Sequence, residues 1–294
     1  MSGNSSKQDV REFYDEIGWK KESDGYYQNA RYEDLRPVSA EYIHNCHMRI
    51  TPYFQNGGKY FLDAGSGPVQ YPEYLTYSEK FEKRVCADIS ITALIEARKR
   101  LGDKGLYVVS DVSALPFKEN AFDGVVSLHT LHHLNLDDQK KAWQEIYRTL
   151  NSGCTAVVVN GWTESKMMKK WLPAVRKAEK LGHFLAVICG KEKQSKKTNQ
   201  SSAKTEPTGT YIQKLDADWI RGVLPSLGKD VEYKILCWRS VNVRWLRALI
   251  HRPYGKKALC SLFKKETQRP EYYGEYGQYP LIVLTRKKNM DQGS

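Results

Sequence analysis

The chain has 294 residues and a formal net charge of +12, because 46 Lys and Arg side chains stand against 34 Asp and Glu. This length suits one α/β domain with insertions. With 40% hydrophobic residues the chain can bury a sizeable core, which excludes a wholly disordered or fibrous protein. The positive charge indicates acidic partners such as nucleic acid, anionic lipid or phosphorylated substrates.

The sequence shows no sign of export or membrane insertion. Its first ten residues are polar, and no stretch approaches the roughly 20 apolar residues that cross a bilayer. The six cysteines form no C-x-x-C pair and no zinc-like spacing, which favours a reducing compartment. We therefore expect a soluble, cytoplasmic protein without a metal site.

Residues 1–55 are rich in tyrosine and charge, and are predicted to form an N-terminal lid or tail. Between 37 and 53, apolar residues recur at helical spacing. The run Asn56-Gly57-Gly58 then breaks the chain. The main domain is expected to occupy residues 56–294.

Strands and helices alternate along the next hundred residues. Apolar runs predict strands at 60–62, 84–87, 106–109, 124–128 and 155–159. Helices are expected between them, at 71–80, after a capping Ser90 and after a capping Asp137. Continuous apolar runs are typical of parallel strands that are covered on both faces. The sequence therefore predicts an α/β, Rossmann-like fold with helices on both sides of a mostly parallel sheet.

Two insertions are expected after this core, at about 162–215 and 239–278. The first holds a predicted amphipathic helix at 171–188 and a polar stretch, Lys191–Thr208, whose composition indicates a mobile loop. A short helix is predicted at 216–224. Residues 231–238 and 280–285 read as the last two strands.

A glycine turn follows the first predicted strand, in the run Leu62-Asp63-Ala64-Gly65-Ser66-Gly67-Pro68. Glycines let a backbone turn tightly and approach a ligand closely, and the following helix N-terminus favours a negative group. Gln70 stands where a dinucleotide fingerprint needs a third glycine, which disfavours an NAD site. A plain strand-to-helix turn is the alternative interpretation.

Aspartates mark three consecutive predicted strands, as Asp63, Asp88 and Asp111. Ligands of open α/β sheets bind at the carboxyl ends of the strands. A carboxylate at Asp88 can accept hydrogen bonds from the two hydroxyls of a ribose, although it could equally cap the next helix. Asp111 could accept from an exocyclic amine such as that of adenine.

These motifs together resemble the class I S-adenosylmethionine-dependent methyltransferases, in particular those that act on small molecules. The matching stretches cover about residues 59–161, in the order of that family: 61–68, 85–88, 110–117, 121–126, 128–134 and 145–153. The resemblance implies a seven-stranded sheet with an antiparallel last strand and S-adenosylmethionine as the cofactor. One departure is Val69, which stands where the family often has a third glycine.

The resemblance also implies which residues bind the cofactor. The loop of Gly65, Ser66 and Gly67, with Asp63 before it, would lie along the methionine and ribose. Asp88 and Ile89 would hold the ribose, Asp111 and Val112 would frame adenine, and His129 would lie beside the methionine. Tyr14 belongs to a segment that resembles a helix closing over the cofactor.

Methyl transfer from a sulfonium needs a general base only if the acceptor must lose a proton. His129, His132 and His133 are the candidate bases, and structural packing is their alternative role. Enzymes that methylate amino groups of nucleic acids usually carry an Asn/Asp-Pro-Pro-Tyr motif after the fourth strand. This chain has Ser127-Leu128-His129-Thr130 there, and the absence of the motif weighs against base N-methylation.

The acceptor is predicted to be a small or lipid-like molecule, recognised by the lid and the two insertions. Both insertions mix basic and aromatic residues, which fits peripheral contact with an anionic surface. The same mixture fits nucleic acid, or simply a solvated lysine face with a buried Trp/Leu stripe. The alternatives are therefore an RNA-directed methyltransferase, with nucleic acid disfavoured, or a catalytically silent cofactor-binding partner.

Overall fold

The computed structural model describes residues 33–188 and 212–288, together with positions 8, 11, 12 and 15. Within these residues a seven-stranded sheet has the order β3-β2-β1-β4-β5-β7-β6. Only β7 runs against the others, which confirms the predicted sheet. The strands are β1 (Gly58–Ala64), β2 (Phe81–Asp88), β3 (Gly105–Val109), β4 (Phe122–Leu128), β5 (Leu150–Val159), β6 (Val231–Arg239) and β7 (Tyr279–Arg286).

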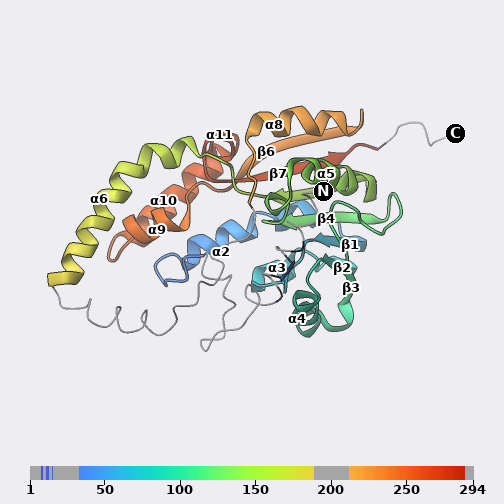
Figure 1. Ribbon diagram of the computed structural model, residues 1–294, viewed down its shortest axis with the longest axis horizontal. Coiled ribbons are helices and arrows are strands. Elements are labelled where there is room, and N and C mark those ends of the chain that lie inside the picture. The colour runs from blue at the N-terminus through green and yellow to red at the C-terminus, as the bar shows by residue number, and fades with distance from the viewer. Residues whose placement is uncertain (1–7, 9–10, 13–14, 16–32, 189–211, 289–294) are drawn as a thin grey trace.

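Helices cover both faces of the sheet, as predicted (Figure 1). On one face, Trp143 and Ile146 of α5 and Ile220 of α8 are buried with the inward side chains of β1, β4 and β5. On the other face, Phe54 and Leu94 belong to a second apolar cluster. The helices of these two layers are α3 (Pro72–Thr76), α4 (Ile91–Leu101), α5 (Leu136–Thr149) and α8 (Ala217–Val223), with 3-10 turns η3 (Thr51–Phe54), η4 (Gly102–Lys104), η5 (Leu131–His133) and η6 (Leu224–Ser226).

A separate group of helices, which we call the helical unit, lies beside the sheet at the left of Figure 1. It consists of α2 (Ala40–Met48), α6 (Lys166–Ile188), α9 (Val243–Leu249) and α10 (Gly255–Gln268). Tyr42, Val175, Trp245 and Leu259, one from each helix, are buried in a common apolar core. The predicted lid helix thus packs against both insertions, and the buried Trp/Leu stripe of the second insertion is confirmed. From this unit, α11 (Pro270–Tyr276) leads the chain back to β7.

Local details differ from the sequence-based expectations at several element boundaries; the helix predicted at 71–80, for example, is the shorter α3, Pro72–Thr76. The side chain of Ser90 accepts a hydrogen bond from Ala93 N, which confirms it as the cap of α4. The cap of α5 is Asn135 and not Asp137, which lies inside the first turn. Helix α6 begins at Lys166, five residues before the predicted start. The predicted loop Lys191–Thr208 lies outside the described residues.

No helix in the described part of the chain combines the length and the apolar character that crossing a bilayer requires.

Candidate cofactor and acceptor site

The glycine turn and two of the three aspartates meet at the carboxyl ends of β1, β2 and β3. These strands are parallel neighbours, with Ala64 paired to Ala87 and Asp88 paired to Val109. Ser110 N, just beyond β3, donates to Asp88 O at 3.0 Å. The sheet therefore brings the Gly65–Gly67 loop, Asp88 and the start of the Asp111 loop to one edge.

Gly65 has a left-handed backbone conformation, with φ +76°, and no room for a side chain. A Cβ at this position would lie 2.1 Å from Thr130 Cγ2 and 2.3 Å from Thr130 Oγ1. Thr130 also closes the turn, because its hydroxyl donates to Gly65 O at 3.0 Å. The loop after β1 is thus locked against the segment after β4 by a contact that only glycine permits.

Val69, which stands where the family often has a third glycine, adopts a left-handed backbone conformation. Its φ is +52°, in a region that β-branched residues rarely adopt, and its side chain is fully buried. Arg100 Nη1 donates to Val69 O at 2.9 Å and to Gln70 O at 2.8 Å. Valine thus takes the place of glycine in this loop, and the Arg100 guanidinium of α4 fixes the backbone there through its hydrogen bonds to the two carbonyls.

Asp88 is a half-buried carboxylate held by two backbone amides. Gly67 N donates to its Oδ2 at 2.8 Å, and Ser90 N donates to its Oδ1 at 2.9 Å. No cation among the described residues pairs with it. Burial raises the pKa of Asp88 to about 6, although the two amides oppose the shift. Each oxygen retains acceptor capacity, so the hydroxyl pair of a ribose fits this carboxylate.

Asp111 and Val112 lie beyond β3, beside Asp88. Asp111 Oδ1 accepts from Ser113 N and Ser113 Oγ, both at 2.8 Å, which fixes the loop. Val112 is buried in the same core cluster as Ala87 of β2. The position of this pair is compatible with the predicted adenine contact, which stays a prediction.

Asp63 has a partner that the sequence-based interpretation missed. It forms a buried ion pair with Arg84 of β2, whose Nε lies 3.2 Å from Asp63 Oδ2. Arg84 Nη1 also donates to Tyr74 O at 2.6 Å. Burial raises the pKa of Asp63, and Arg84 acts in the opposite direction. This carboxylate is therefore engaged within the sheet, and the predicted cofactor contact of Asp63 remains untested.

His129 follows β4 in a left-handed conformation, with φ +56°, inside a group of aromatic rings. Its ring meets those of Trp238 and Tyr279 edge-on, at centroid distances of 5.0 and 5.5 Å. Burial lowers the pKa of His129 to about 3, with a smaller effect of Arg239 in the same direction. His129 is consequently neutral near pH 7.

The other two candidate histidines lie in the η5 turn after His129. The rings of His132 and His133 are 4.3 Å apart between centroids, and His132 Nδ1 is 3.2 Å from Asn160 Oδ1. Burial, followed by the neighbouring His133, lowers the pKa of His132 well below its usual value. A base with so low a pKa is poorly matched to proton transfer at pH 7.

Two cations lie beside these aromatic rings: Arg239, which ends β6, and Lys214, from the segment before α8. The Arg239 guanidinium stacks on Trp238 and Tyr279, at 5.0 and 4.7 Å from their ring centroids, and pairs with Glu33. Lys214 lies over Gly161 beside the Tyr279 ring, and burial lowers its pKa. Arg239 is 2% exposed, and its Nε has no partner among the described groups.

The sequence suggested none of Arg84, Thr130 and Lys214 as site residues, because the contacts of each depend on pairing between distant segments.

The remaining predicted residues lie near the end of β2 or outside the described part of the chain. Ile89 lies half-buried between Asp88 and α4. Tyr14 lies outside the described residues. Asp15, which the structure does describe, accepts a hydrogen bond from Ser90 Oγ and so lies beside the start of α4. Among the described residues no cluster of His, Cys, Asp or Glu is arranged to hold a metal ion.

Comparison with known proteins identifies the central part of the chain. Residues 62–158 match the model of a family described as a methyltransferase domain. A tRNA (carboxymethyluridine(34)-5-O)-methyltransferase of Arabidopsis thaliana is 28% identical, over 46% of this chain and 37% of that protein. The chain thus spans little more than a third of the length of this curated relative.

Two solved structures share the fold. Phosphoethanolamine N-methyltransferase 1 of Haemonchus contortus superposes with a TM-score of 0.57 at 11% identity, covering 100% of this chain and 52% of that chain. The [4+2]-cyclase SpnF gives 0.52 at 18% identity, covering 97% and 98%. These likenesses concern the fold alone, since the second protein is named for a different reaction. The family match confirms the predicted resemblance and S-adenosylmethionine as the cofactor.

Proposed function

We propose that this chain, whose residues 62–158 match the methyltransferase-domain model, transfers the methyl group of S-adenosylmethionine to a small or lipid-like acceptor. The observation that carries the proposal is the Asp88 carboxylate, which two amides orient beside the Gly65–Gly67 loop. It is half-buried, no cation in the described part of the chain pairs with it, and each of its oxygens can still accept a hydrogen bond from a ribose hydroxyl. Asp111 and Val112 would then lie against the adenine.

The acceptor would bind on the His129 side of the loop. Tyr279, packed against the fully buried Trp238, supplies an aromatic wall there, and Lys214 supplies positive charge. The buried Arg239, in contrast, is already paired with Glu33. An aromatic ring combined with a placed cation suits a planar or apolar molecule that carries an anionic group. A neutral acceptor would gain little from the charge of Lys214, whereas an anionic acceptor would be both attracted and oriented by it.

The proposed reaction requires no general base from this chain. S-adenosylmethionine supplies a methyl group on a positively charged sulfur. The chain's own residues hold the acceptor in line with that group and exclude water. His129 contributes as a neutral, positioning ring, because its pKa of about 3 leaves it a weak base. An acceptor whose nucleophile is already deprotonated, such as a carboxylate, meets this requirement.

Binding of S-adenosylhomocysteine is expected to weaken as the pH falls below about 6. Ribose hydroxyls bind the ionised form of Asp88, whose pKa is about 6 in the unliganded protein. At lower pH the carboxylate must first lose a proton, so the affinity falls by up to about tenfold per pH unit. Isothermal titration calorimetry at pH values from 5 to 8, in steps of about one unit, measures how the affinity depends on pH. Asp88→Asn should show weaker but pH-independent binding, and a wild-type affinity constant across this range contradicts the assignment.

The acceptor class is tested by supplying methyl-labelled S-adenosylmethionine to the purified full chain with separate lipid, small-metabolite and RNA fractions of cell extract. We expect label in the lipid or small-metabolite fraction. With the acceptor so identified, His129→Asn should retain more than about a tenth of kcat, because loss of a true general base costs about 10²–10⁴-fold. A larger loss that rising pH partly restores would indicate instead that His129 accepts a proton from the acceptor.

RNA is the second candidate acceptor, and two observations favour it. The matching relative from Arabidopsis thaliana is named as a tRNA methyltransferase, and this chain carries a net charge of +12. Label appearing in the RNA fraction alone would replace the small-molecule assignment. Binding of S-adenosylhomocysteine without label in any fraction would instead favour a catalytically silent partner protein.

A further inference from the structure

The positive charge of the chain is concentrated on the helical unit. Helix α6 and residues 243–268, which hold α9 and α10, carry thirteen Lys and Arg against Glu179 and Glu266, a net of +11 out of +12. Glu179 is occupied by Arg244, with two contacts of 2.8 Å. Glu266 is buried and pairs with Arg49 at 3.0 Å. Neither acid therefore offsets the exposed lysines of α6.

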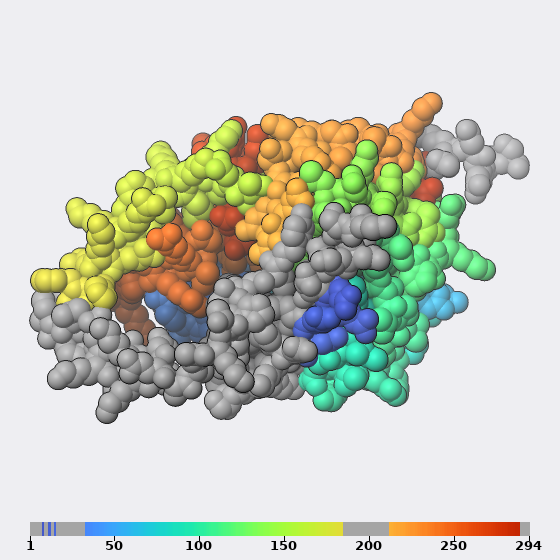
Figure 2. All heavy atoms as spheres, viewed as in Figure 1, coloured from blue at the N-terminus to red at the C-terminus, as the bar shows by residue number. Residues whose placement is uncertain are grey.

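Large apolar side chains are exposed on the same unit. Leu181 and Phe184 of α6 are 58% and 60% exposed, and Tyr254 before α10 is 75% exposed. All four residues from Leu181 to Phe184 are exposed. Figure 2 shows α6, in yellow-green, at the outer edge of the molecule. Apolar side chains that are exposed together on one segment mark an interaction surface more often than isolated ones do.

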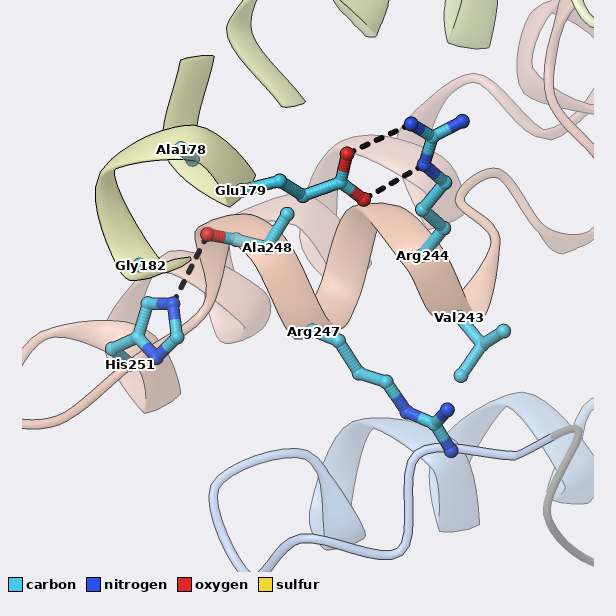
Figure 3. Close-up of a pocket in the computed structure, with 8 residues that line it drawn as sticks. All are labelled: Ala178, Glu179, Gly182, Val243, Arg244, Arg247, Ala248 and His251. Carbon is cyan, nitrogen blue, oxygen red and sulfur yellow. Dashed lines mark hydrogen bonds and ion pairs between the residues drawn. The ribbon is translucent and has the colours of Figure 1, made fainter. Parts of the chain in front are cut away.

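The inner side of α6 faces a groove toward α9 of about 410 Å³ (Figure 3). Ala178, Glu179 and Gly182 supply the α6 wall, and Arg247 and His251 stand across it. Leu181 and Phe184 do not line this groove. Since a helix turns about 100° per residue, they lie on the side away from Gly182. The outer face of α6 is thus distinct from its packed face.

Lysines share the outer face with these apolar residues. At about 100° per residue, Lys170, Lys177, Leu181 and Phe184 fall within about one sixth of a turn, and Lys180 is adjacent. Lys170, Lys177 and Lys180 are all exposed. This is the arrangement of a helix that lies in a membrane interface, with apolar side chains entering the acyl region and lysines reaching headgroup phosphates.

We propose that the outer face of α6, defined by Lys170, Lys177, Lys180, Leu181 and Phe184, docks the protein on an anionic lipid bilayer. The lysines provide charge complementarity to the headgroups, and Leu181 with Phe184 provides apolar insertion. A nucleic acid would use the lysines and could stack a base on the Phe184 ring, but it would gain nothing from Leu181, which an acyl region accommodates together with Phe184. The proposal stands independently of the methyl acceptor.

The test is co-sedimentation of the full chain with vesicles of phosphatidylcholine alone or mixed with phosphatidylglycerol. Binding should require phosphatidylglycerol and decrease with salt. Two double variants, Lys177→Glu with Lys180→Glu and Leu181→Glu with Phe184→Glu, should each lower the partition coefficient at least tenfold. Ile95→Glu on α4 is the control, because Ile95 is 53% exposed and α4 lies far from α6 in Figure 1. The partitioning of this variant should equal that of the wild type.

Three outcomes overturn the proposal. The first is absence of binding to phosphatidylglycerol vesicles by a wild-type protein that melts cooperatively. The second is an equal loss of vesicle binding in Ile95→Glu, because it would show that the net charge of the protein, and not the outer face of α6, determines binding. The third is tight, salt-sensitive binding of transfer RNA, measured by fluorescence anisotropy, that the lysine variant abolishes and an uncharged Leu181→Ser, Phe184→Ser variant leaves intact. That result would assign the surface to nucleic acid.

Discussion

Replacing Asp88 by alanine is expected to weaken binding of S-adenosylhomocysteine by at least about a hundredfold. Two hydrogen bonds to an ionised acceptor contribute about 1.5–3 kcal/mol each, and about 1.4 kcal/mol corresponds to a factor of ten. The alanine variant also frees the amides of Gly67 and Ser90, which Asp88 now accepts from at 2.8 and 2.9 Å. Isothermal titration calorimetry measures the affinity directly.

The matched control for this variant is Asp103→Ala. Asp103 is an exposed carboxylate in the η4 turn, away from the carboxyl ends of the strands. It should leave both the affinity and the melting temperature within error of the wild type. An Asp88→Ala protein that melts like the wild type and binds S-adenosylhomocysteine equally well would remove Asp88 from the cofactor site.

The sheet and its glycine turn could be predicted because their signals are local. Continuous apolar runs specify buried parallel strands, and the glycines after β1 specify the turn. The side-chain cap of α4 was equally readable from Ser90. At α5 three polar residues, Asn135, Asp137 and Asp138, stand close together, and composition alone does not say which takes the extended conformation of a cap. The structure selects Asn135 because the chain leaves η5 only one residue earlier.

The acceptor side could not be predicted because it is assembled from distant segments. By composition Trp238 and Arg239 belong with the basic and aromatic residues of the second insertion, yet they end β6 and face rings from β4 and β7. Lys214 reaches the same place from before α8. Strand order β5-β7-β6, which brings these residues together, depends on antiparallel pairing of β7. Only the pattern of a charged residue ending a buried strand hinted at Arg239.

Asp63 matches the family motif, but in the structure its carboxylate forms a buried ion pair with Arg84 between β1 and β2. Both residues are buried, on adjacent strands, where Asp63 is paired in register with Cys86, two residues beyond Arg84. Side chains two residues apart on one strand share a face of the sheet, so Asp63 and Arg84 meet diagonally. A buried charge in a central strand requires a partner, and Arg84 supplies the opposite charge from the neighbouring strand.

Replacing Asp63 by alanine is therefore expected to lower the free energy of unfolding by about 3–5 kcal/mol, because the Arg84 guanidinium is left buried without its counter-charge. Urea unfolding followed by circular dichroism measures this loss. Asp63→Leu combined with Arg84→Met should recover most of it, since apolar pairs of similar volume often replace buried ion pairs without cost. The control Glu164→Ala breaks an exposed pair with Lys169 and should change stability by less than about 1 kcal/mol. If Asp63→Ala stays as stable as that control and loses S-adenosylhomocysteine binding instead, the carboxylate serves the cofactor directly, and Arg84 only orients it.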